Sequence, residues 1–155
     1  MVSMAAVRTD LKSKGWSRQS GTLDELRKAA SLDGLVSAAR AASSNERVLV
    51  PYEAAKAPRL SLSATYGLGK QPLHSDGAHL HEPPDVIVLH SAEPTSTSTV
   101  VWTPSYKGED ALPEAARTGL FTVRGNGESF LAPARDAGGL RFDPVVMSPG
   151  DSYAR

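Results

Sequence analysis

The sequence contains no cysteine in 155 residues. This absence excludes disulfides, thiolate zinc sites, iron–sulfur clusters and cysteine nucleophiles. The sequence also lacks a charge surplus, because lysine plus arginine and aspartate plus glutamate number 17 each. A basic surface for nucleic acid or an anionic membrane is therefore not expected. No apolar run approaches the ~20 residues of a membrane-spanning helix, and the N-terminus lacks the apolar core of a signal peptide. We expect a cytoplasmic protein.

The composition, with 40% hydrophobic and 22% charged residues, is typical of a soluble globular protein. The length suits one domain spanning 1–155. Near the N-terminus, Thr22 and Glu25 form a capping-box pattern, and apolar residues then recur at helical spacing. This pattern predicts a helix over about 23–32, which ends at Gly34.

Short β-prone segments separated by glycine, proline and asparagine follow from residue 47. The segment Gly125-Asn126-Gly127 is a strong turn signal, so 120–131 is predicted to be a hairpin. A helical start followed by many short strands indicates an α+β protein with an antiparallel sandwich or barrel. The predicted strands are Val48–Tyr52, Leu60–Tyr66, Val86–His90, Thr99–Trp102, Leu120–Arg124, Ser129–Leu131 and Leu140–Phe142.

The candidate chemistry lies at His74 and Asp76. In a strand, side chains two residues apart share a face, so this imidazole and carboxylate would occupy adjacent positions around one metal ion. Iron(II) accepts this mixture of nitrogen and oxygen ligands. The spacing alone is equally compatible with a hydrogen-bonded surface pair.

The other histidines have less specific interpretations. His79 and His81 have the opposite parity from His74 in a straight strand, unless Gly77 bends the chain. We expect both side chains to be either solvated or in contact with a metal ligand that they support. His90 follows an apolar run and is predicted to be a core or edge histidine.

Several motifs around the His-x-Asp pair occur in a recognisable order. The central ones are Leu73-His-Ser-Asp76, Pro83-Pro84, the apolar run Val86–Leu89 and Thr95–Trp102. Weaker matches flank them at Leu11–Trp16, Ser61–Gly67 and Arg141–Pro149. Together they cover nearly the whole chain, which resembles the taurine dioxygenase-like family of iron(II)/2-oxoglutarate-dependent oxygenases. The segment before Thr99, Thr-Ser-Thr-Ser, departs from the Gly-Gly-Asp common in that family.

The resemblance implies a jelly-roll (cupin-like) double-stranded β-helix after a helical N-terminal cap, with residues 1–46 as the cap and 47–155 as the first part of the β-core. It implies iron(II) bound by His74 and Asp76, 2-oxoglutarate as cosubstrate with Thr99 contacting its carboxylate, and a small-molecule substrate. No oligomeric state is implied.

The family's third ligand, a late histidine, and the arginine that anchors 2-oxoglutarate have no counterpart after His74. We therefore expect a truncated domain that is inactive as an oxygenase by itself. Two alternatives remain open. One is a non-catalytic metal- or ligand-binding module with a diverged fold, and the other is an enzyme whose third ligand comes from His79, His81 or a partner subunit.

Overall fold

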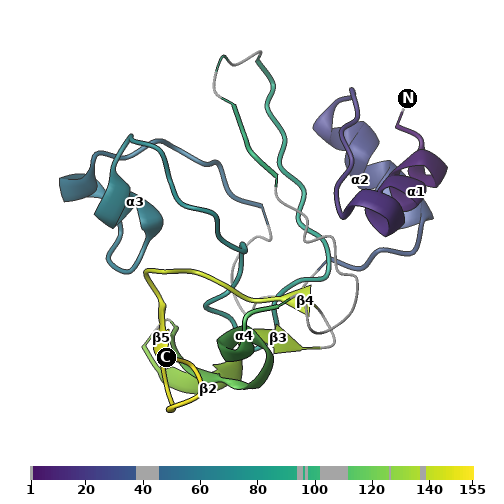
Figure 1. Ribbon diagram of the computed structural model, residues 1–155. Helices are drawn as coiled ribbons and strands as arrows, with labels where there is room; N and C mark the ends of the chain where they lie inside the picture. Colours follow the sequence, from purple (N-terminus) through teal and green to yellow (C-terminus); the bar gives the residue numbers. More distant parts are fainter. Residues whose placement is uncertain are drawn as a thin grey trace. The chain divides into compact units, whose positions relative to one another are not determined.

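The computed structural model describes residues 2–37, 46–93, 96, 98–101, 112–125, 127–136 and 139–155. The chain divides into two compact units. The first comprises 1–47 and 88–104, and the second comprises 48–87 and 105–155. Within the described residues the protein combines four α-helices with an open three-stranded antiparallel sheet (Figure 1). The α+β prediction is therefore confirmed at the level of mixed helix and sheet.

The first unit contains helices α1 (Met4–Lys14) and α2 (Leu23–Leu32). Asp33, at the end of α2, is bound by Arg8 of α1, whose Nε lies 2.8 Å from the carboxylate. The guanidinium also donates to the Asp33 carbonyl at 3.1 Å. This two-point contact fixes the C-terminal end of α2 against α1.

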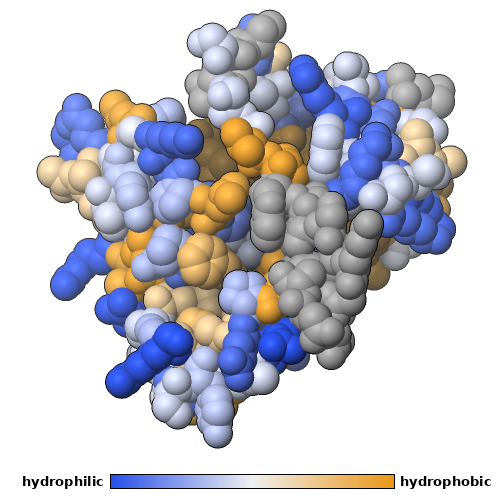
Figure 2. Space-filling view, in the orientation of Figure 1, coloured by the Kyte–Doolittle hydropathy of each residue, from blue (hydrophilic) through white to orange (hydrophobic). Residues whose placement is uncertain are grey.

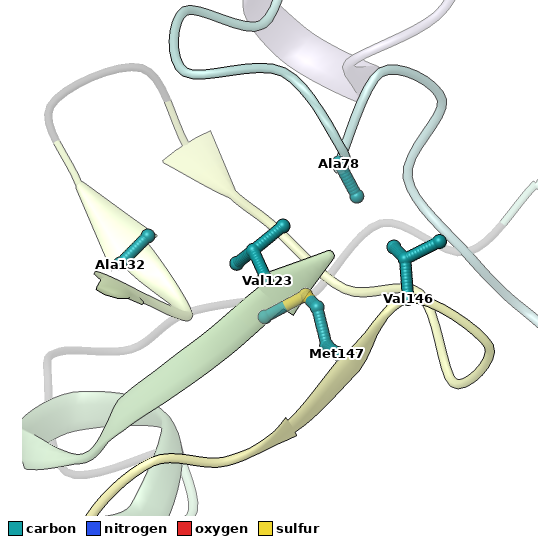
Figure 3. Close-up of a cluster of buried hydrophobic side chains, with 5 residues drawn as sticks. All are labelled: Ala78, Val123, Ala132, Val146 and Met147. Atoms are coloured by element: carbon teal, nitrogen blue, oxygen red, sulfur yellow. The ribbon is translucent and has the colours of Figure 1, made fainter. Parts of the chain in front are cut away.

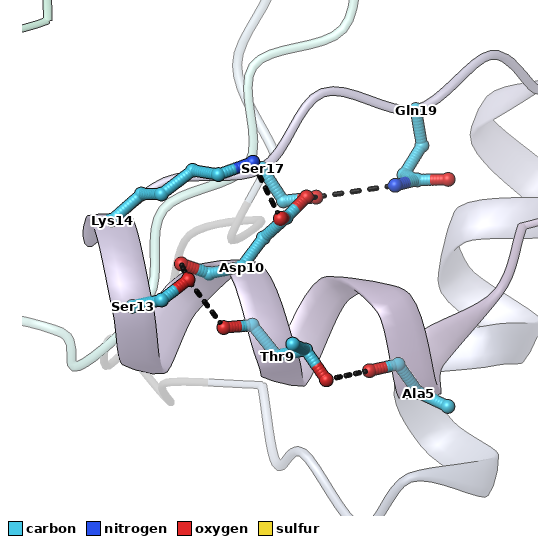
Figure 4. Close-up of polar contacts among 7 residues, drawn as sticks. All are labelled: Ala5, Thr9, Asp10, Ser13, Lys14, Ser17 and Gln19. Carbon is cyan, nitrogen blue, oxygen red and sulfur yellow. Dashed lines mark hydrogen bonds and ion pairs between the residues drawn. The ribbon is translucent and has the colours of Figure 1, made fainter.

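The C-terminal half of α1 carries a polar network around Asp10 (Figure 4). Lys14 donates to one carboxylate oxygen at 2.7 Å and Ser17 donates to the other at 3.0 Å. These bonds, that from Lys14 first, hold the pKa of Asp10 below its usual value. Ser17 in turn accepts from Gln19, so the network connects the end of α1 to the segment that leads into α2.

Helix α2 begins as the sequence predicts. The Thr22 hydroxyl accepts from the Glu25 amide at 3.2 Å, and the Glu25 carboxylate accepts from the Thr22 amide at 2.9 Å. Gly34 follows the helix with a φ of 77°, a left-handed conformation that glycine adopts without strain. The predicted helix, its capping box and its end are all confirmed.

We predict that Thr22→Ala lowers the free energy of unfolding by about 1 kcal/mol, because the first turn of α2 loses a side-chain acceptor. Urea denaturation followed by circular dichroism measures this difference. Ser20→Ala is the matched control, since Ser20 is exposed and lies just before the cap. Equal stability of the two variants would contradict a stabilising role for the cap.

The same cap should make stability depend on pH. The hydrogen bond from the Thr22 amide holds the pKa of Glu25 below its usual value. A carboxyl group with a lowered pKa stabilises the fold above its unfolded-state pKa, and this contribution disappears as the pH falls through the folded-state value. The difference between wild type and Glu25→Gln should therefore shrink on acidification below about pH 4.

The second unit contains the sheet, in the order β2–β1–β5. Strand β1 (Leu120–Arg124) pairs with β2 (Ser129–Pro133) on one side and with β5 (Met147–Pro149) on the other, both antiparallel. The predicted hairpin is confirmed, with Arg124 opposite Ser129 and the Gly125 amide donating to the Glu128 carbonyl. Asn126 lies outside the described residues.

Smaller elements accompany the sheet. They are the 3-10 helix η1 (Ala54–Lys56), helices α3 (Leu62–Tyr66) and α4 (Glu114–Thr118), and the two-stranded pair β3 (Arg135–Asp136) and β4 (Gly139–Leu140). No helix among the described residues is long and apolar enough to cross a bilayer.

One face of the sheet supports a small core (Figure 3). Val123 in β1 is completely buried, and Ala78, from the segment that follows Asp76, packs into the same cluster. The remaining buried members are Ala132, Val146 and Met147. Because Ala78 belongs to this core, the segment that carries the candidate metal ligands is attached directly to the sheet.

Four strand predictions were wrong in the described residues. The segment 60–66 contains helix α3, because the Ser61 hydroxyl caps the helix by accepting from the Ala64 amide and Gly67 ends it. The segments 48–52 and 86–90 form no strand, and neither do 99–101. Of the predicted strand 140–142, only Leu140 lies in a strand, β4.

These apolar segments lack a strand partner in the described chain, and several of their side chains are exposed, among them Val48, Leu49 and Leu89. Figure 2 shows apolar residues, in orange, at the molecular surface. Strand formation depends on pairing with a neighbouring strand more than on the intrinsic preference of the residues, and composition alone does not supply that neighbour.

Candidate metal site

His74 and Asp76 lie in the second unit, in a segment without regular secondary structure rather than in the strand that was assumed from their spacing. A turn spans 76–79, and within it Gly77 has a φ of 79°. The prediction that the two side chains share one face of a strand was therefore wrong. The turn nevertheless brings them together, with His74 Nε2 at 3.3 Å from Asp76 Oδ1.

The other ring nitrogen of His74 defines the chemistry of this pair. His74 Nδ1 lies 2.9 Å from the carbonyl oxygen of Pro72. A carbonyl oxygen can only accept, so Nδ1 carries the proton and donates it. In the neutral imidazole, Nε2 is then the unprotonated nitrogen, and it lies 3.3 Å from the Asp76 carboxylate oxygen. A ring nitrogen and a carboxylate oxygen this close together can share one cation.

Two kinds of cation can be shared in this way. One is a second proton on Nε2, which would make His74–Asp76 an ion pair. The other is a metal ion. Two ligand atoms that each lie ~2.1 Å from a metal, at right angles, are about 3.0 Å apart, close to the observed 3.3 Å. A backbone carbonyl on the distal nitrogen is also the usual partner of a metal-binding histidine. The donor pair thus fits a metal such as iron(II), and both side chains are partly exposed, at 26% for His74 and 48% for Asp76.

The residue between the two candidate ligands is fixed to a distant part of the chain. The Ser75 amide donates to the Phe142 carbonyl at 2.6 Å. The Ser75 hydroxyl donates to the Leu140 carbonyl at 2.9 Å and accepts from the Phe142 amide at 3.2 Å. Three hydrogen bonds therefore position the backbone from which His74 and Asp76 extend.

Arg141 lies between Leu140 and Phe142 in the sequence, and its side chain binds the backbone that follows Asp76. Its side chain is buried, at 4% exposure. The guanidinium donates to the carbonyls of Ala78 and His81 at 3.0 Å each, and also to the Leu80 carbonyl. The carbonyl dipoles compensate the buried positive charge, which is costly to bury without such partners.

The remaining histidines do not join this pair. The Nε2 of His81 lies 3.1 Å from a carboxylate oxygen of Glu128, and its ring stacks on Phe130 with centroids 3.8 Å apart. His79 is half-buried on the turn. His90 was predicted to be a core or edge histidine, but it is exposed in a segment that forms no strand, so both alternatives are wrong. Among the described residues no group of three or more histidine, aspartate or glutamate side chains is arranged to hold a metal.

Thr99, predicted to contact 2-oxoglutarate, belongs to the first unit, whereas His74 and Asp76 belong to the second. It is exposed and lies in a segment without regular secondary structure. Trp102, which ends the motif that carried this prediction, lies outside the described residues. The role of Thr99 stays a prediction.

Sequence inspection missed the contribution of Ser75 and Arg141 to this site. Arg141 lies in the family-like segment Arg141–Pro149, and its partners are 60 to 63 positions away. An arginine followed by an apolar residue gives no local signal for such contacts. Comparisons of the chain with protein-family models, with curated proteins and with solved structures found no match.

Proposed function

We propose that His74 and Asp76 supply two ligands of an iron(II) site, in a taurine dioxygenase-like protein that uses 2-oxoglutarate as cosubstrate and acts on a small molecule. The observation that carries this proposal is the Nε2–Oδ1 distance of 3.3 Å, combined with the hydrogen bond from Nδ1 to Pro72. Together they place an unprotonated ring nitrogen and a carboxylate oxygen close enough to bind one metal ion. We propose further that the open sheet is part of a double-stranded β-helix.

Each residue has a defined task in this proposal. His74 is a neutral donor held in one tautomer, and Asp76 is an anionic donor that compensates part of the metal charge. The Thr99 hydroxyl would donate to a carboxylate of 2-oxoglutarate. Bound iron(II) would supply the redox chemistry by which oxygen is used to oxidise a substrate. All four histidines of the sequence are at or before position 90, so the chain offers no late histidine as the third ligand.

The proposal predicts saturable iron(II) binding that depends on both residues. Anaerobic titration with iron(II), followed by paramagnetic broadening of assigned NMR signals, should affect His74 and Asp76 first. His74→Ala and Asp76→Ala should each weaken binding at least about tenfold, because each removes one of two protein ligands. His90→Ala, at an exposed histidine of the first unit, is the control and should bind like wild type. Unchanged binding in both ligand variants would identify the pair as an ion pair only.

A second measurement separates an oxygenase site from a non-catalytic metal-binding module. In an oxygenase site, 2-oxoglutarate should bind only when metal is present and should tighten metal binding in return, and Thr99→Val should reduce that coupling. A module without cosubstrate chemistry should show no coupling. With iron(II), ascorbate and 2-oxoglutarate, the chain alone should form no succinate, and steady succinate formation would contradict a two-ligand site.

A further inference from the structure

The segment Leu140–Phe142, which we call the 140–142 clamp, contacts the chain on both sides of Asp76. On one side it binds Ser75 through the three hydrogen bonds described above. On the other side Arg141 binds the carbonyls of the turn from Ala78 to His81. The site residue Asp76 therefore lies between two fixed points that are both set by one distant tripeptide.

The chemistry of arginine explains why one side chain can fix a whole turn. Its planar guanidinium presents five N–H groups in a rigid fork. Here one terminal nitrogen of Arg141 serves two carbonyls and the other serves a third. The guanidinium also lies over the Phe130 ring, with Cζ 5.7 Å from the centroid, so the sheet restrains its position. Lysine keeps the charge but cannot reproduce this fork.

We propose that Arg141 is a positioning residue for the metal pair, and that the 140–142 clamp sets metal affinity by holding the backbone on both sides of Asp76. The proposal rests on the metal-binding function proposed above. With the clamp in place, the 3.3 Å separation of His74 Nε2 and Asp76 Oδ1 exists before metal arrives. Without it, metal binding must order the turn, and the lost conformational entropy weakens affinity.

The test compares Arg141→Lys and Ser75→Ala with Arg124→Lys in the full chain. Arg124 is the matched control because it is exposed on β1 and donates to the Val145 carbonyl, outside the turn. Two quantities are measured well below the unfolding midpoint of each variant. They are the dissociation constant for iron(II) under anaerobic conditions and the hydrogen exchange of the amides of Ser75, Ala78 and Leu80.

We expect Arg141→Lys to weaken iron(II) binding by about tenfold or more, the usual effect of removing a residue that supports a metal ligand. Exchange at Ala78 and Leu80 should accelerate, while the β1 amides stay protected. Ser75→Ala should weaken binding in the same direction and accelerate exchange at Ser75, which keeps the test decisive if Arg141→Lys does not fold. Arg124→Lys should change neither quantity.

The two proposals fail in different ways. If wild type binds no iron(II), the proposed function is wrong, and the exchange rates alone decide whether the clamp holds the turn. If wild type binds iron(II) through His74 and Asp76 but Arg141→Lys and Ser75→Ala bind equally well, the positioning role is overturned. A lower unfolding midpoint with an unchanged dissociation constant would likewise overturn it, because that result describes a purely structural residue.

Discussion

Val123→Asp should abolish the folded structure of the second unit. Val123 is completely buried in the centre of β1, and its neighbours in the core are apolar side chains. A carboxylate there would lose its hydration without gaining a partner, a change that costs several kcal/mol. Because the described core has few members, other contacts cannot compensate. Loss of dispersion in the amide NMR spectrum of residues 120–149 is the expected observation.

Leu131→Asp is the control for this experiment. Leu131 lies in the neighbouring strand β2 but is 59% exposed, so a carboxylate at that position stays hydrated. This variant should keep a dispersed spectrum and an unfolding midpoint close to that of wild type. A folded Val123→Asp protein with native β1 chemical shifts would show that the cluster around Val123 is not the core of the unit.

Gly119→Ala should lower the free energy of unfolding by about 3 kcal/mol, the upper range for forced overpacking. A Cβ at Gly119 would lie 2.6 Å from the carbonyl oxygen of Ala115 and 2.6 Å from Cα of Ala154. Both are backbone atoms, so no side chain can rotate away. The φ of Gly119 is −76°, which any residue adopts, and the requirement for glycine is therefore one of space alone. Urea denaturation of the two proteins measures the difference.

Gly127→Ala provides the contrasting case. Gly127 has a φ of 89°, and a Cβ there would meet no atom within 4 Å. Its replacement by alanine should therefore lower the free energy of unfolding by about 1 to 2 kcal/mol, because a residue with a Cβ is strained only by the left-handed backbone conformation. A smaller loss for Gly119→Ala than for Gly127→Ala would contradict the close packing of the C-terminal residues against the start of β1.

The parts of the fold that the sequence predicted well are those stabilised by nearby residues. The capping box at Thr22 and Glu25 closes within four positions, so the start of α2 was visible in the sequence. The hairpin of β1 and β2 was also visible, because the Gly-Asn-Gly sequence between the two strands is a turn signal that predicts which residues pair. The signals for α3 were equally local, with a serine cap at Ser61 and a glycine, Gly67, at the end. A strand was nevertheless predicted there, because the residues of the segment are β-prone.

The predictions that failed depended on distant partners. Runs such as 48–52 and 86–90 have the composition of strands, but each would need a neighbouring strand, and the described chain pairs neither. Strand β5 pairs with β1 across more than twenty positions, and no turn signal announces that pairing. The packing of Ala78 beside Val123 also joins residues that are far apart in the sequence.

By itself the sequence determined that one imidazole and one carboxylate are two positions apart, that cysteine chemistry is excluded, and where helix α2 and the hairpin form. Only the tertiary structure decided that His74 and Asp76 converge through a turn and not along a strand, and that Leu140–Phe142 holds that turn. The physical reason is the separation along the sequence between the residues that interact. Caps and tight turns are satisfied within a few residues, whereas a buried guanidinium and a core methyl group find their partners only after the chain has folded.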